Sequence, residues 1–278
     1  MESQRVTIED FEKYFNEIHG YDPYPWQKRF LEKIIKERDW PGAINLPTGS
    51  GKTACIDIVI FALACESDLK PSDRIVPRRI IFSVNRRVIV DEACQRSEKI
   101  ARLILEAEKS DTDSILKQVA YALRKIAGTD SSTTDAPPID VIELRGGMYR
   151  DNQWARSATQ PIVICSTIDQ IGSRLLFRGY GVSHKAAPVQ SALIAYDSLI
   201  FLDEAHISEP FRQTLDQVHR YLSQGNYYEK DIGVHPVKII PMTATPSETM
   251  KGQGLIEIDE DDRKIDVLDR RLVSTKKT

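Results

Sequence analysis

Apolar side chains near the start of the chain recur at helical spacing. A capping-box-like start at Thr7 precedes them, and they share one face as far as Gly20, where a helix would end. Pro25 suits the first turn of a second helix, whose buried stripe starts at Phe30. We therefore predict that residues 1–41 hold two helices ahead of the first strand.

Short apolar runs then alternate with helical patterns over most of the chain. Strands separated by helices are typical of a parallel sheet that is covered on both faces. The predicted strands are 43–46, 79–84, 141–144, 162–165, 199–202 and 237–240, and the predicted helices begin at Lys52, Arg87, Thr167 and Phe211. We predict an α/β, doubly wound fold: a mostly parallel sheet with helices on both faces, preceded by the N-terminal helices.

Polar stretches interrupt this alternation. Residues 107–138 look like an insertion around one short helical pattern with a mobile loop, and 66–77 and 179–187 look like further loops. The last part of the chain has one more alternating apolar piece and then a charged stretch. We predict one domain over 42–250, with 251–278 as a linker.

The composition is that of a globular protein, because 41% of the 278 residues are hydrophobic and 28% are charged. The longest nearly apolar run is broken by Asp57 and is too short to span a bilayer, and the polar N-terminus does not resemble a secretion signal. Four cysteines without a C-x-x-C pair indicate reduced thiols, so we expect a cytoplasmic protein with no membrane partner. A net charge of −3 excludes a wholly basic surface but is compatible with a local basic groove.

One loop has the pattern of a phosphate-binding site. Residues 46–53 read LPTGSGKT, follow a predicted strand and open a predicted helix, although Leu46 stands where the general pattern has a glycine. The two glycines would let backbone N–H groups converge on an anion at the positive end of the helix. Lys52 would reach the β and γ phosphates, and Thr53 would give its hydroxyl to Mg²⁺. The predicted nucleotide-binding residues of this loop are Thr48, Gly49, Ser50, Gly51, Lys52 and Thr53.

A second motif places carboxylates at the end of a predicted strand. The sequence LIFLDEAH carries Asp203 and Glu204 beyond the carboxyl edge of the sheet. Asp203 would hold Mg²⁺ through its water shell, and Glu204 would orient and deprotonate the attacking water. In the motif MTATP, which follows another predicted strand, the hydroxyls of Thr243 and Thr245 would hydrogen-bond the acid strand and, with His206, sense the γ phosphate.

Together these motifs resemble those of the superfamily-2 helicases: Gln27 in PWQ, then GSGKT, DEAH and TAT, in an order that covers nearly the whole chain. Within that group the chain looks most like the ATPase core of the CRISPR-associated helicase-nuclease of type I interference systems. The closer likeness lies in residues 83–92 (SVNRRVIVDE), 144–147 (LRGG), 166–181 (STIDQIGSRLLFRGYG) and 203–211 (DEAHISEPF). The resemblance implies a RecA-like P-loop ATPase lobe that uses ATP and Mg²⁺.

The same resemblance assigns further residues. It implies that Gln27 reads the adenine edge with its two-sided amide. It also implies a single-stranded DNA track at the top of the sheet, lined by Asn85, Arg86, Arg145, Gly146, Gly147, Thr167 and Gln170. Contacts there would go to the sugar–phosphate backbone, and the two arginines would make binding sensitive to salt. For either arginine taken alone, a solvated surface role is an equal alternative.

A working helicase needs a second RecA-like lobe that contributes arginine fingers. We expect that lobe, and the nuclease with its His-Asp motif, to lie outside this chain. The expected function is therefore the first lobe of an ATP-dependent DNA helicase, an ATP hydrolase that is weak or inactive in isolation and that serves antiviral defence with a CRISPR surveillance complex. The alternatives are the motor subunit of a restriction or repair complex and a nucleic-acid-binding fragment without turnover.

Overall fold

Seven parallel strands form one sheet in the computed structural model, which describes residues 5–131, 134–145, 153–155, 157–204, 209–224, 235–243, 254–265 and 268–269. Their spatial order is β3 (Asp140–Leu144), β4 (Ile162–Thr167), β2 (Arg79–Val84), β5 (Ser198–Leu202), β6 (Lys238–Thr243), β1 (Ala43–Asn45) and β7 (Leu255–Glu257). Each neighbouring pair of these strands is parallel. The structure confirms the predicted α/β class, a parallel sheet with helices on both faces, preceded by N-terminal helices.

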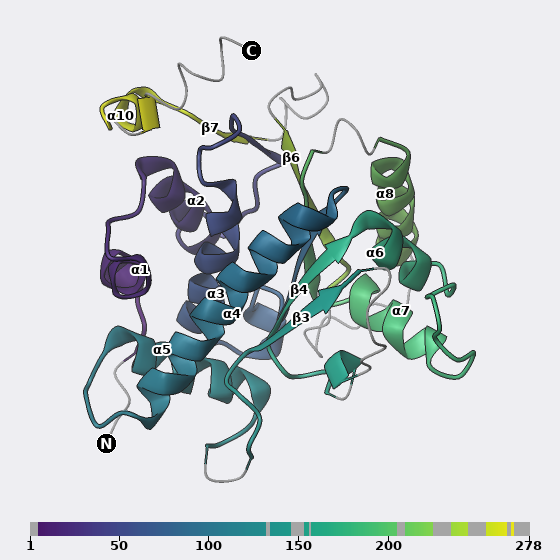
Figure 1. Cartoon of the computed structure of the whole chain (residues 1–278), viewed down its shortest axis with the longest axis horizontal. Coiled ribbons are helices and arrows are strands. Elements are labelled where there is room, and N and C mark those ends of the chain that lie inside the picture. Colours follow the sequence, from purple (N-terminus) through teal and green to yellow (C-terminus); the bar gives the residue numbers. More distant parts are fainter. Residues whose placement is uncertain are drawn as a thin grey trace.

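Helices cover both faces of the sheet (Figure 1). They are α1 (Phe11–His19), α2 (Pro25–Ile35), α3 (Cys55–Cys65), α4 (Arg87–Lys109), α5 (Ile115–Ala127), α6 (Ile168–Leu175), α7 (Ala187–Ala195), α8 (Glu209–Gln224) and the short α10 (Glu260–Arg263). Successive residues of a strand point to opposite faces, so Ile80 and Phe82 of β2 join the core under α1 to α5, whereas Ile81 joins the core under α6 to α8. Two apolar cores therefore hold the sheet in a three-layer sandwich.

The N-terminal helices form as predicted. Gly20 ends α1 in the left-handed conformation, with φ of 77°, and Pro25 is the first residue of α2. The apolar face of α1 packs on α3, where the ring centroids of Phe11 and Phe61 lie 5.3 Å apart. These helices are thus part of the main core and place the α1–α2 connection beside the loop that follows β1.

The segment that we expected to be an insertion is an integral part of the fold. Helix α5 buries most of its apolar residues against α3 and α4. Arg124 of α5 donates to both carboxylate oxygens of Glu108 at the end of α4, at 2.8 and 2.9 Å, and both residues are buried. The sequence predicted a helical pattern here, but the polar stretches on either side of it did not indicate that the helix packs into the main core.

The C-terminal part also differs from the prediction. Residues 254–264, expected within a linker, supply β7 and α10 instead. The carboxylate of Asp262 is fully buried, accepts from the backbone N–H of Trp26 at 2.8 Å and pairs with Arg29 at 2.7 Å, which anchors α10 to α2. The four cysteines are free and buried. Over the part of the chain that the structure describes, no helix has the length and apolar character needed to cross a membrane.

Candidate nucleotide-binding site

The loop after β1 turns through two glycines in the left-handed conformation. Gly49 and Gly51 have φ of 82° and 81°, values that L side chains rarely adopt. Ser50 closes the turn between them, since its hydroxyl donates to the carbonyl oxygen of Pro47 at 2.7 Å and the residue is buried. A 3-10 turn, Lys52–Ala54, then leads into α3. Ser50 therefore shapes the loop in this structure, and its assignment as a nucleotide-binding residue stays a prediction.

The phosphate loop and the acid strand face each other. Lys52 Nζ lies 3.5 Å from Asp203 Oδ1, and both side chains are mostly buried. The backbone N–H of Asp203 donates to the carbonyl oxygen of Ser83, which extends the β5–β2 pairing by one residue. The N–H of Glu204 donates to the same Asp203 Oδ1 at 3.0 Å, and Glu204 has a left-handed φ of 51°, which is strained for a glutamate. The structure thus brings the predicted catalytic residues to one place, and their chemical roles stay predictions.

The third predicted motif reaches the same edge. Thr243 is the last residue of β6, is buried and lies opposite Asn45 in the register with β1, directly before the phosphate loop. His206 and Thr245 lie outside the described residues. Thr53 is half-buried in the first turn that leads into α3. A threonine hydroxyl and the Asp203 carboxylate are oxygen ligands of the kind that Mg²⁺ prefers, so the residues present fit a magnesium-bound nucleotide.

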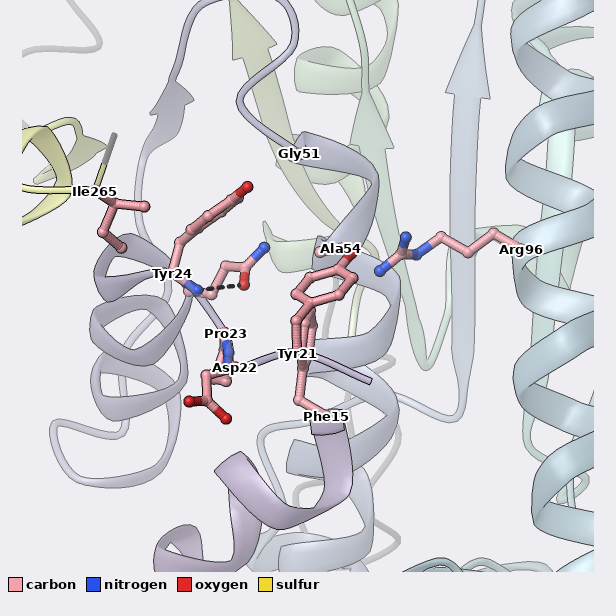
Figure 2. Close-up of a pocket in the computed structure, with 10 residues that line it drawn as sticks. Phe15, Tyr21, Asp22, Pro23, Tyr24, Gly51, Ala54, Arg96 and Ile265 are labelled. Carbon is pink, nitrogen blue, oxygen red and sulfur yellow. Dashed lines mark hydrogen bonds between the residues drawn. The ribbon is translucent and has the colours of Figure 1, made fainter. Parts of the chain in front are cut away.

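A cavity of about 520 Å³ opens beside the phosphate loop (Figure 2). Its walls come from the α1–α2 connection, the start of α3, the middle of α4 and the C-terminal segment, and the residues are Phe15, Tyr21, Asp22, Pro23, Tyr24, Gln27, Gly51, Ala54, Arg96 and Ile265. Aromatic rings give a planar base a surface for stacking. The cavity therefore has the position and lining expected for the base of a nucleotide whose phosphates lie on the loop.

Gln27 lies in this cavity, and the oxygen of its side-chain amide already accepts one hydrogen bond. Its Oε1 accepts from the backbone N–H of Tyr24 at 2.9 Å, which caps the start of α2. The amide nitrogen is directed toward the phosphate loop, since a Cβ added to Gly51 would lie 3.7 Å from Nε2. In this arrangement the Tyr24 hydrogen bond fixes the orientation of the Gln27 amide and uses one of the two lone pairs of Oε1. The two-sided reading of adenine stays a prediction.

Two further residues of the site were not identified from the sequence. The indole N–H of Trp26 donates to the carbonyl oxygen of Ser50 at 3.2 Å and so ties the phosphate loop to α2. Arg96 extends from α4 into the cavity (Figure 2) and is held by Asp57 of α3, whose two oxygens accept from it at 2.8 and 3.1 Å. His19 Nε2 lies 2.5 Å from the same carboxylate.

The charges of this buried group stabilise each other. Burial raises the pKa of Asp57, but the charge of Arg96 and the hydrogen bonds from His19 and Arg96 outweigh it and hold the pKa below its ordinary value. Burial likewise opposes the charge of Arg96, and Asp57 raises the pKa of Arg96 in return. The guanidinium at the cavity wall is therefore a fixed positive charge.

Three of the predicted nucleic-acid residues, Asn85, Arg86 and Thr167, lie at one edge of the sheet. In the parallel register Val84 lies opposite Thr167, and Leu144 lies opposite Ser166, so β2, β3 and β4 end at the same level. Asn85 and Arg86 follow β2 and are exposed, and Arg86 precedes the first residue of α4. Gly146 and Gly147 lie outside the described residues.

Two other predicted nucleic-acid residues are placed differently from the prediction. Gln170 is buried, and its Oε1 accepts from Arg174 at 2.5 Å, so it packs within α6 and does not line a track. Arg145 lies 2.6 Å from Asp91 Oδ1 and 2.5 Å from Glu143 Oε1. Burial, with the nearby Asp91 carboxyl, raises the pKa of Glu143. The charge of Arg145 is largely balanced by these acids.

A glycine-rich loop faces an acidic strand at the carboxyl edge of a parallel α/β sheet, and this arrangement gives the protein the fold of a helicase-like ATPase domain. Residues 20–248 match the family described as "Type III restriction enzyme, res subunit", and the chain belongs to that family. Among solved structures, the crystal structure of the yeast DEAD-box splicing factor Prp28 is similar, with 14% identity and a TM-score of 0.49. The match covers 91% of this chain and 48% of that one, so this chain spans about half of its length. Among proteins with curated descriptions, none matches this chain.

Proposed function

We propose that this chain binds Mg-ATP beside its phosphate loop and serves as the first ATPase lobe of a nucleic-acid translocase. The observation that carries the proposal is the 3.5 Å approach of Lys52 to Asp203, because it joins the two halves of a phosphoryl-transfer site that lie far apart in the sequence. Lys52 would bind the β and γ phosphates, Asp203 and Thr53 would hold Mg²⁺, and Glu204 would take the proton of the attacking water. Bound Mg²⁺ would neutralise phosphate charge.

Equilibrium binding of a fluorescent ATP analogue with Mg²⁺ tests this site. We expect weak binding by the wild-type chain and a loss of at least about tenfold in affinity in Lys52→Ala, because the phosphates lose a direct cation. Lys36→Ala is the matched control, since Lys36 is an exposed lysine at the C-cap of α2 whose partner is Glu32. Equal affinity of all three proteins would contradict the assignment of the loop.

Turnover is expected to be slow in this chain alone. Arginine fingers from a second lobe contribute roughly 10³ to 10⁵ in rate in comparable enzymes. Steady-state phosphate release with and without single-stranded DNA measures the activity, and Glu204→Gln gives the background. Robust DNA-stimulated release that Glu204→Gln abolishes would support the ATPase but contradict the need for a second lobe.

Coupling between nucleotide binding and nucleic-acid binding distinguishes a motor from a protein that only binds nucleic acid. A motor lobe should change its affinity for single-stranded DNA when a non-hydrolysable ATP analogue binds, and the nucleotide affinity must then change by the same factor. Filter binding of labelled DNA with and without nucleotide measures this factor. Unchanged DNA affinity would favour a nucleic-acid-binding fragment without turnover.

We further propose that the intact protein is the helicase-nuclease of a type I CRISPR system. The support is the likeness of four sequence segments, including SVNRRVIVDE and STIDQIGSRLLFRGYG. The family match favours a second candidate, the motor subunit of a restriction complex. Affinity capture of the full-length protein decides between them: a CRISPR surveillance complex as partner supports the first, and restriction subunits support the second.

A further inference from the structure

The connection between α6 and α7 exposes large apolar side chains. Phe177 is 61% exposed and Tyr180 is 64% exposed, and the adjacent Leu176 is 50% exposed. Single exposed apolar residues are ordinary on protein surfaces, but a cluster within residues 176–180 is not. In the described structure nothing covers these rings.

The backbone that presents them is ordered and locally strained. Phe177 has φ of 61°, at a helix end where glycine is usual. Its N–H donates to the carbonyl oxygen of Arg174, and the next N–H donates to that of Ser173 at 2.6 Å. Gly179 fits tightly, since an added Cβ would lie 2.7 Å from Val182 Cγ2. Phe177 is an exposed aromatic residue in a disfavoured backbone conformation. Backbone strain and exposed apolar side chains of this kind are concentrated at binding sites.

The charge of this segment indicates the partner. No Asp or Glu occurs between Gln170 and Tyr196, although the whole chain has a net charge of −3. Arg178 and Lys185 are exposed in the same connection, and no acidic partner contacts either of them in the described structure. Exposed aromatic rings interleaved with unpaired cations fit a strand that carries both bases and phosphates.

The position of the connection suits a strand that leaves the carboxyl edge of the sheet. Helix α6 starts directly after Thr167, at that edge, and Phe177 lies just past its end. Eight residues of helix span about 12 Å. At the stacked spacing of about 3.4 Å per nucleotide, about four nucleotides cover this distance.

We propose that Phe177 and Tyr180 form a base-stacking platform for single-stranded nucleic acid, with Arg178 and Lys185 contacting its phosphates. The platform rests on the proposed function and adds to it, because base stacking here supplements backbone contacts at the top of the sheet. Stacking on aromatic rings is tolerant of sequence, as a translocase requires.

Fluorescence anisotropy with a labelled single-stranded oligonucleotide tests the platform. We expect the double variant Phe177→Ala/Tyr180→Ala to bind at least about tenfold more weakly than wild type, and Phe177→Trp to keep the affinity. Tyr121→Ala, which removes an exposed tyrosine of α5, is the matched control and should bind like wild type. Thermal unfolding should show that the double variant is as stable as wild type, because it loses only exposed rings.

A second oligonucleotide distinguishes stacking from a general loss of binding. With abasic positions in place of bases, wild type should bind as weakly as the double variant, and the two should no longer differ. Arg178→Ala/Lys185→Ala should reduce the magnitude of the slope of log affinity against log salt by about 1.4, since each phosphate contact to a single strand contributes about 0.7.

These experiments distinguish a failure of the platform from a failure of the proposed function. If wild type binds the oligonucleotide with nucleotide linkage and the double variant binds equally well, the platform is wrong and the proposed function stands. If wild type binds Mg-ATP but no nucleic acid, both the platform and the translocase role are wrong. A double variant that loses only self-association would assign the rings to a protein contact and overturn the proposal.

Discussion

Replacing Arg96 by methionine should destabilise the lobe by about 3 kcal/mol. Asp57 has no solvent exposure, and Arg96 donates to both of its oxygens. Methionine keeps most of the length of the side chain, but among the hydrogen bonds of the described residues it leaves the buried carboxylate with that of His19. Removing one partner of a buried ion pair costs about 3–5 kcal/mol, and the lower end applies here because His19 remains. In a domain of this size such a loss lowers Tm by about 6–12 °C.

A double-mutant cycle measured by urea unfolding isolates the pair. We expect Asp57→Asn and Arg96→Met to be less than additive, with a coupling energy of about 2 kcal/mol. Arg102→Met is the control on the same helix, because Arg102 is exposed and lies 3.8 Å from the exposed Glu106. Its effect should stay within about 0.5 kcal/mol. A coupling energy below about 0.5 kcal/mol, or an equal effect of Arg102→Met, would refute the reasoning.

The pH dependence gives an independent check. A carboxyl whose pKa is lowered by folding stabilises the fold above its unfolded pKa, about 3.9, and this contribution is lost as the pH falls through the lower folded value. Wild type should therefore keep the contribution of Asp57 down to about pH 4. In Arg96→Met the buried carboxylate costs most at neutral pH, where it is charged, and protonation of Asp57 relieves that cost. The stability difference between the two proteins should accordingly shrink from pH 7 to pH 4, and a difference that grows would contradict the assignment.

Three further predictions concern the nucleotide site. Glu204→Gly should stabilise the fold by about 0.5–1 kcal/mol in thermal unfolding, because glycine accepts the left-handed φ, and should abolish phosphate release. Trp26→Phe leaves the buried carbonyl oxygen of Ser50 without its donor, so we expect a loss of about 1–3 kcal/mol in unfolding and weaker ATP-analogue binding. Because Gln27 Oε1 shares its acceptor capacity between Tyr24 and a bound base, competition binding should show ATP and GTP affinities that differ by far less than the roughly 10⁴-fold expected of a site that hydrogen-bonds every polar group of its ligand.

Much of the fold was predictable because its signals are local. The strands 79–84 and 199–202 were visible as short apolar runs, and the structure has β2 and β5 there. Helix α7 was missed since its sequence APVQSALIA is apolar almost all round and has no amphipathic period. Its first residue, Ala187, fell within the predicted loop 179–187.

The C-terminal segment shows a different limit of prediction from sequence. Charged sequence around Asp262 indicates a solvated linker when it is considered alone, yet Asp262 is fully buried because Arg29 and the start of α2 supply partners for its carboxylate. Those partners lie more than 200 residues earlier in the chain. Burial of a charge depends on such distant partners, which no local pattern contains.

The candidate site shows the same difference between features set by local sequence and features set by distant partners. The phosphate loop and the acid pair were predictable, because each is a short motif whose backbone geometry follows from its own residues. The environment of Arg145 was not: its charge looked available for phosphates, but Asp91 of α4 and Glu143 of β3 balance it. Arg178 had no such competitor, since its whole neighbourhood in the sequence lacks acids. A cation is therefore a better candidate for nucleic-acid contact when the surrounding structure leaves its charge unpaired than when a family motif alone points to it.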